Sequence, residues 1–135
     1  ASSFQVTGTV SAFCTASATN MNFGSQGNFN ADVLATSTLT VTCTNNAGYW
    51  VGLDNGQNSA TPAARKMIRG AQTVTYSLYR DSARLNVWGN TNPTDTLAGV
   101  GAATAQPLTI YGKVPAQPTP QAGTYTDTVT ATVNF

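Results

Sequence analysis

The sequence predicts an all-β protein, an antiparallel β-sandwich, from three observations. The dominant hydrophobic period is two, which is the alternation of a strand with one buried face. The composition favours strands, because 23 of the 135 residues are threonine, and threonine, valine and tyrosine suit a pleated, half-buried surface. Turn sequences such as Asp54-Asn-Gly56 and Asn92-Pro93 separate short apolar runs. A chain of this length has the size of one domain.

Two segments show the alternation most clearly. In the segment 35–43, Leu39, Val41 and Cys43 share one face and threonines occupy the other, so this cysteine is predicted to lie in the core. In the segment 125–135 one face is apolar and the other carries threonine and asparagine. Weaker patterns predict strands at 49–53, 67–68, 73–80, 85–88 and 107–114. No segment predicts a helix, and short strands separated by turns favour an immunoglobulin-like (Ig-like) sandwich.

The two ends of the chain carry the most informative pattern. The last strand stops at Phe135 with its apolar face still lacking a neighbour, so a seventh strand of the sandwich is predicted to be missing. Conversely, an extra alternating segment precedes the first cysteine, and ten extended residues span about 33 Å, the length of a sandwich. This segment is either an ordinary first strand of the same molecule or a strand that inserts into a neighbouring molecule. Its apolar positions are Phe4, Val6, Gly8, Val10 and Ala12.

The composition excludes several classes of function. Charged residues make up 8% of the chain against a typical value of about 25%, and the net charge of +1 gives no field for nucleic acid or an anionic membrane. The chain has no histidine and no glutamate, so a Ser-His-Asp triad, an HExxH zinc helix and paired glutamates are excluded. We therefore predict no enzyme activity, no cofactor and no metal. No apolar run of about 20 residues predicts membrane insertion. If the protein is exported, its signal peptide has been removed.

The two cysteines, Cys14 and Cys43, lie too far apart in sequence for the short spacings of metal sites. A disulfide is the simplest interpretation. Closing a loop of about 30 residues would stabilise the fold by roughly 3–4 kcal/mol, and such a bond persists in the periplasm or outside the cell. Two buried free thiols are the alternative.

Other motifs favour structural interpretations. The basic cluster Arg65-Lys-Met-Ile-Arg69 is predicted to lie on a solvated edge or at a contact between subunits. The glycines of the segment 99–104 form an incomplete GxGxxG without the βαβ context of a dinucleotide site. The segment 54–58 has too few carboxylates for a calcium loop and is predicted to be a turn. The tryptophans and tyrosines are predicted to be core or interface residues rather than a sugar-stacking platform.

A set of short motifs, in this order, resembles one family. The chain is similar to the spore coat protein U domain pilins, the archaic or Csu-type class of chaperone–usher pilus subunits, over nearly its whole length. The motifs are Val6-Thr-Gly-Thr-Val10 before Cys14, Asn22-Phe-Gly24, Leu39-Thr-Val-Thr-Cys43, Tyr76-Ser-Leu-Tyr-Arg-Asp-Ser-Ala-Arg84, Val87-Trp-Gly89, Ile110-Tyr-Gly-Lys-Val-Pro115 and Gly123-Thr-Tyr-Thr-Asp-Thr-Val129.

The resemblance implies an incomplete Ig-like antiparallel β-sandwich, completed by a donor strand from a neighbouring subunit. Residues 1–13 would be the donor-strand extension and residues 14–135 the Ig-like pilin domain. The Cys14–Cys43 disulfide would tie the first strand to the second, and a change of register is expected near Thr19-Asn20. The donor side chains would be Phe4, Val6, Gly8, Val10 and Ala12. The acceptor groove would be lined from the C-terminal side by Tyr125, Val129, Ala131, Val133 and Phe135.

The function that the resemblance implies is structural. The chain would be a shaft subunit of a cell-surface pilus of a Gram-negative bacterium, reached through the periplasm, which supports surface attachment and biofilm formation. Its partners would be identical or related pilin subunits in a filament, with a periplasmic chaperone and an outer-membrane usher during assembly. A monomeric, secreted carbohydrate-binding β-sandwich is the alternative, and purified polymers or monomers would distinguish the two.

Overall fold

The computed structural model describes all residues, 1–135, and contains eight β-strands. The single helical element is the one-turn 3-10 helix η1 (Pro62–Ala64), so no helix is long and apolar enough to cross a membrane. The strands are β1 (Cys14–Ala18), β2 (Val33–Cys43), β3 (Gly48–Leu53), β4 (Arg65–Arg69), β5 (Gln72–Tyr79), β6 (Leu97–Val100), β7 (Ala105–Val114) and β8 (Ala131–Asn134).

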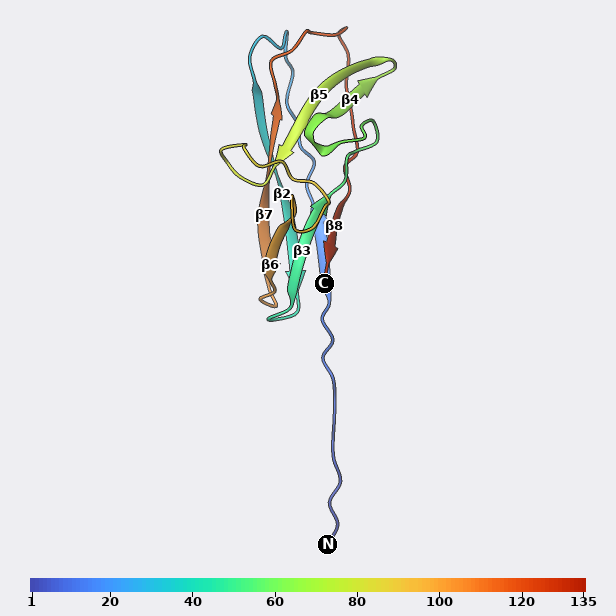
Figure 1. Cartoon of the computed structure of the whole chain (residues 1–135), viewed down its shortest axis with the longest axis vertical. Coiled ribbons are helices and arrows are strands. Elements are labelled where there is room, and N and C mark those ends of the chain that lie inside the picture. Colours follow the sequence, from blue (N-terminus) through green and yellow to red (C-terminus); the bar gives the residue numbers. More distant parts are fainter.

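The strands form two antiparallel sheets that pack as a sandwich (Figure 1). One sheet has the order β1-β2-β7-β5-β4 and the other the order β6-β3-β8. The alternation predicted for β2 is present, because Leu39, Val41 and Cys43 are buried while the threonines between them are more exposed. Trp88 is fully buried in the core, where its indole N–H donates to the carbonyl of Val51 at 2.9 Å. These features confirm the predicted all-β sandwich.

The first strand is fastened to the second by the disulfide. Cys14 and Cys43 lie opposite each other in the β1–β2 pair, and their sulfurs are bonded at 2.03 Å. The strand ends at Ala18, and the backbone N–H of Thr19 still donates to the Thr38 carbonyl at 2.9 Å in the same register. The chain then turns inward, and Met21 packs over Gly112 of β7, where a Cβ atom would collide with the Met21 sulfur.

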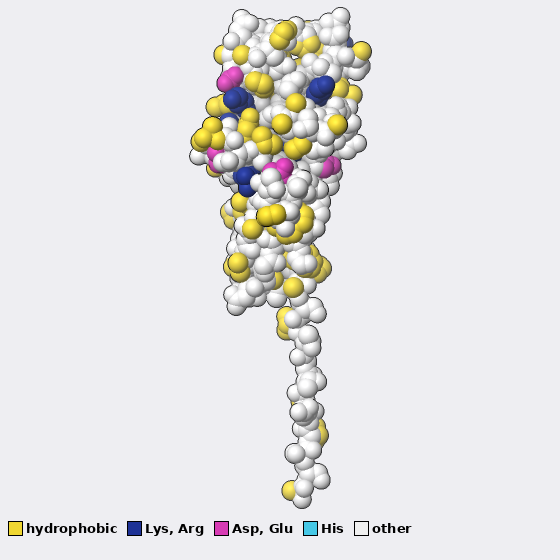
Figure 2. Space-filling view, viewed as in Figure 1, with side chains coloured by type: hydrophobic (Ala, Val, Ile, Leu, Met, Phe, Trp, Pro, Cys, Tyr) yellow, Lys and Arg dark blue, Asp and Glu magenta, His cyan; other side chains and the backbone are white.

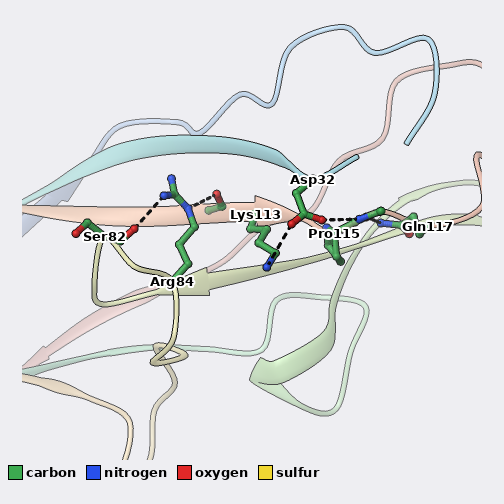
Figure 3. A network of polar contacts seen from close by, with 8 residues as sticks. Asp32, Ser82, Arg84, Lys113, Pro115 and Gln117 are labelled. Atoms are coloured by element: carbon green, nitrogen blue, oxygen red, sulfur yellow. Dashed lines mark hydrogen bonds and ion pairs between the residues drawn. The ribbon is translucent and has the colours of Figure 1, made fainter. Parts of the chain in front are cut away.

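Polar contacts fasten the ends of the large sheet to its loops (Figure 3). Arg84 reaches back from its loop to donate to the Gly112 carbonyl at 3.1 Å, and its guanidinium lies 5.5 Å from the centroid of the Tyr111 ring. Lys113 pairs with Asp32 at 3.6 Å, and Asp32 also accepts the backbone N–H of Ala116 at 2.9 Å. Asp32 precedes β2 and Ala116 follows β7, so these contacts hold the two long strands together.

Several predicted elements differ from the structure. The segment 85–88 is not a strand and makes one isolated bridge, between Val87 and Tyr79. The strand β6 was not predicted. The last strand pairs as β8 only at its C-terminal end, and a separate bridge joins Thr126 to Ile68.

The basic cluster is also different from the prediction, which placed it on a solvated edge or subunit contact. Lys66 and Arg69 are exposed, whereas Arg65 is fully buried. Its guanidinium donates to main-chain carbonyls, among them those of Asp54 and Trp88, each at 2.7 Å. Desolvation in the core lowers the Arg65 pKa from its usual value. A buried cation is tolerated here because main-chain oxygens satisfy its donors.

Candidate functional site

The N-terminal residues form a free tail. Phe4, Val6 and Val10 are 86%, 85% and 87% exposed, and Figure 2 shows the tail standing clear of the body. The tail ends at Phe13, whose backbone N–H donates to the Thr44 hydroxyl and whose carbonyl accepts from the Thr44 N–H, both at 2.9 Å. Apart from the Ser11 carbonyl, which accepts from the Thr44 hydroxyl at 3.4 Å, residues 1–12 are therefore the free part of the chain. Three large apolar side chains on one face of an exposed segment are unfavourable in water.

At the other end of the chain, the segment 125–134 forms a half-paired strand, which we call the open edge. Its β8 part is the outer strand of the three-stranded sheet. Further up, Thr126 exchanges both backbone bonds with Ile68, at 2.9 and 3.1 Å, and the Thr130 carbonyl accepts from Asp54 N–H at 3.0 Å. The backbone N–H and C=O groups of the alternate residues Tyr125, Asp127 and Val129 have no partner within the molecule. These backbone groups are therefore free to pair with a further strand.

The side chains of the open edge keep the alternation that the sequence predicted. Tyr125, Val129, Ala131 and Val133 are half-buried and pack against the core, while the threonines between them are exposed. Phe135 is 58% exposed, and its ring packs edge-on against that of Phe13 at a centroid distance of 6.3 Å. The five residues predicted to line an acceptor groove therefore lie along one side of the molecule. None of the predicted donor side chains packs with them.

Asp127 interrupts the apolar face of the open edge, and sequence reasoning did not single it out. One carboxylate oxygen accepts from the Tyr76 hydroxyl at 2.5 Å, and the other from the backbone N–H of Gln57 at 2.9 Å. Burial, and then this hydrogen bond to Asp127, raises the Tyr76 pKa far above its usual value. The Tyr76 ring also packs beside Phe23, at a centroid distance of 6.3 Å. Asp127 thereby fixes the start of the open edge to β5 and the loop after β3.

A second aspartate holds the next part of the same segment. One Asp54 oxygen accepts the backbone N–H of Thr130 at 3.0 Å and that of Gly56 at 2.9 Å. The Gly56 bond closes the turn that was predicted at this position, and the glycine adopts a φ of 76°, which favours glycine. The Asp54 carbonyl in turn accepts from buried Arg65. Two carboxylates and one buried cation therefore position the open edge.

The first strand supplies a second unpaired edge. β1 is the outer strand of the five-stranded sheet, and it lies beside β8 without a backbone hydrogen bond between them. Ala16 and Ala18, which share the parity of Cys14, are exposed. At the pole opposite the tail, a pocket of about 640 Å³ separates the chain after β1 from the start of the open edge. Its apolar lining includes Met21, Phe23, Met67 and Tyr125.

Known proteins resemble the chain over most of its length. Protein U of Myxococcus xanthus is 36% identical over an alignment of 111 residues, and the match covers 77% of this chain and 62% of that protein, so the chain spans less than two thirds of this relative. The fold is similar to a chain of the CsuC–CsuE chaperone–tip adhesion subunit pre-assembly complex from the archaic chaperone–usher Csu pili of Acinetobacter baumannii. The TM-score is 0.67 at 28% identity, and the match covers 94% of this chain and 40% of that chain.

The family follows from the match that covers the tail and the sandwich together. Residues 1–132 match the family described as Spore Coat Protein U domain. This confirms the resemblance inferred from the sequence motifs, and the protein belongs to the Spore Coat Protein U domain family.

Proposed function

We propose that the protein is a structural pilus subunit that polymerises by donor-strand complementation. In this proposal residues 1–13 of one copy are the donor extension, and the domain 14–135 of the next copy accepts it beside β8. One observation carries the proposal: the same molecule has an exposed N-terminal segment whose apolar residues alternate with polar ones, and an unpaired edge with a half-covered apolar face. The exposed segment has no sheet to pair with, and the open edge has no strand on its free side, so each can complete the other.

The direction of assembly follows from where the tail leaves the domain. The tail leaves beside the C-terminus, where Phe13 meets Phe135, and points away from the body (Figure 1). A copy stacked below in the same orientation receives the tail from its opposite pole. The donor strand then runs antiparallel to β8 and parallel to β1. Because donor and acceptor surfaces differ, the contact does not close on itself and builds a filament.

The expected energies suit a polymer. Burying the side chains of Phe4, Val6 and Val10 would contribute about 1.5–3 kcal/mol each. The added backbone hydrogen bonds would contribute a net of about 1 kcal/mol apiece. Their sum is comparable with the stability of a whole domain, about 5–15 kcal/mol. A subunit without a donor is therefore expected to be only marginally stable and prone to pair with other strands.

Such a subunit needs protection before it assembles. We expect a periplasmic chaperone to cover the open edge and an outer-membrane usher to organise the exchange for a donor tail. The structural neighbour from the Csu pili comes from a complex between a chaperone and a subunit, which supports this expectation. The filament would lie on the cell surface of a Gram-negative bacterium and serve attachment and biofilm formation.

Deletion of residues 1–12 tests the proposal. The truncated chain should still bind a chaperone, because the open edge is intact, but it should not form filaments when it is the only subunit. Electron microscopy of cells or purified material would show this directly. Normal filaments from the truncated chain would contradict donor-strand complementation.

The size of the intact protein separates the proposal from the alternative of a secreted binding module. Polymers held by inserted strands should run as a ladder in SDS without heating and collapse to one band on boiling. A full-length protein that remains a monomer at high concentration would favour the binding module.

A further inference from the structure

We infer a specific register for the donor strand, in which Gly8 of one copy lies opposite Asp127 of the next. The inference rests on the proposed function and specifies how the two chains pair. In antiparallel pairing, the residue numbers of opposed residues have a constant sum, which here is 135. The resulting pairs along the open edge are Val10 with Tyr125, Gly8 with Asp127, Val6 with Val129 and Phe4 with Ala131.

The faces of the two segments restrict the register to odd sums. The exposed apolar positions of the tail are even-numbered, whereas the inward positions of the open edge are odd-numbered. Directly opposed residues point to the same face of a sheet, so an apolar tail residue must oppose an inward residue. A slip of one residue would turn Phe4, Val6 and Val10 to the solvent. The remaining choices differ by steps of two residues.

The part-buried carboxylate of Asp127 selects among these choices. Asp127 is the one inward position of the open edge that is not apolar, and its carboxylate accepts bonds from Tyr76, Gln57 and Asn58. A valine pressed against this carboxylate would remove its remaining contact with water, which is unfavourable for a charged group. A sum of 137 places Val10 there, and a sum of 133 places Val6 there. A sum of 135 places Gly8 opposite Asp127, and glycine has no side chain that could desolvate the carboxylate.

A sum of 139 would also place a small residue, Ala12, opposite Asp127, but the body of the donor copy excludes it. The donor body begins at Phe13, which is bonded to Thr44 of its own chain. In that register Phe13 would be level with Thr126, so the donor body would overlap the loop formed by residues 119–125 at the acceptor pole. With a sum of 135, Phe13 is level with Ala122, four residues further toward the pole, so the donor body meets less of this loop and lies beside the pocket.

The sizes of the opposed side chains agree with this register. The largest donor side chain, Phe4, meets the smallest residue of the β8 face, Ala131. The sum of 139 would instead oppose Gly8 and Ala131, which would leave a void at the centre of the contact. Alternation of large and small residues across the pair fills the space more evenly.

Paired cysteines test the register. Val6→Cys is combined in turn with Val129→Cys, Ala131→Cys or Val133→Cys in full-length subunits, and filaments are oxidised by air with a copper catalyst. Directly opposed strand residues lie within the Cα separation that a disulfide spans. We expect the pair at 6 and 129 to give multimers that survive boiling and disappear with reductant, and the pairs with 131 and 133 to give several-fold fewer. The single variants at 6, 129, 131 and 133 are the controls for tail-to-tail and non-specific bonds.

A second readout does not depend on new cysteines. Gly8→Val should reduce polymer yield by about tenfold or more, because the new side chain meets the Asp127 site. The matched change Ala12→Val, which adds bulk at the edge of the contact, should reduce it far less. Filaments whose cross-links form mainly through residue 131 or 133, or not at all, would overturn the register. A wild-type protein that forms no filaments would overturn the proposed function itself.

Discussion

The tail and the open edge have the same sequence pattern but opposite surroundings. Both alternate apolar and polar residues with a period of two. In the open edge the apolar residues are half-buried against the core, as at Val133, while in the tail Val6 and Val10 are 85% and 87% exposed. The pattern predicts strand conformation and the face that seeks burial. It does not say which molecule provides the other half of the contact.

The tail and the open edge should differ most in how the subunit responds to a charged residue on the apolar face. Val133→Asp should destabilise the subunit itself by about 3–5 kcal/mol, because it places an unpaired carboxylate against the core. Val10→Asp should leave the free subunit unchanged, because the side chain is in water there, but should abolish assembly. Urea unfolding followed by tryptophan fluorescence measures the first effect, and electron microscopy measures the second.

Thr9→Asp is the matched control for the tail. It adds the same charge on the polar face, so it should assemble nearly as well as the wild type. Equal assembly of the Val10→Asp and Thr9→Asp variants would contradict the assignment of the tail faces.

The disulfide sharpens the comparison, because it marks the boundary between tail and domain. Replacing both Cys14 and Cys43 by alanine should lower the free energy of unfolding by about 3 kcal/mol, since the closed loop no longer restricts the unfolded chain. The tail should be unaffected, so variant subunits that do fold should still act as donors. A variant with wild-type stability in urea would show that the bond adds nothing to the fold.

Much of the fold could be predicted because its strands follow the period of two. The long β2 and β7 strands were found this way, as was the apolar face of the open edge. β6 was missed because Gly99 and Gly101 weaken the strand pattern. Both glycines are required by tertiary contacts, since a Cβ on Gly99 would collide with Tyr49 and one on Gly101 with the Thr44 carbonyl.

A smaller change in stability is expected when the bond that anchors the open edge is removed. Tyr76→Phe removes the hydroxyl that bonds Asp127 and should lower subunit stability by about 1–2 kcal/mol. Because the start of the open edge is then held less firmly, polymer yield should also fall. The solvent-facing change Thr128→Ala leaves the Asp127 carboxylate bonds in place and should affect neither quantity. Equal effects of the two changes would contradict an anchoring role for Asp127.

The polar network around this anchor could not be predicted from the sequence. Arg65 lies in a run of charged residues that is typical of a surface, but its long side chain reaches carbonyls of β3 and of the loop at Trp88. Asp127 lies in a threonine-rich strand and gives no local signal of its bond to Tyr76, 51 positions away. Such contacts depend on how distant segments pack, which hydrophobic periodicity does not encode.

The smallest expected effect is on the titration of Asp81, which lies in a loop outside both the tail and the open edge. The Asp81 carboxylate accepts backbone N–H groups of Asn86 and Leu85, which lowers its pKa below the usual value of about 3.9. These bonds contribute fully above that value and are lost as the pH falls through the lower pKa of the folded protein. Carbon NMR of the side-chain carboxyl should therefore show a midpoint below about 3.9. A midpoint at or above it would contradict the capping bonds.

A structure of the assembled filament tests the central claim most directly. Donor-strand complementation predicts that a strand lies between β1 and β8 of every internal subunit, with Val6 and Val10 facing the core, and that it is continuous with Cys14 of the neighbouring copy. Density that connects this strand to Cys14 of the same subunit, or an open edge left empty in a native filament, would contradict the account.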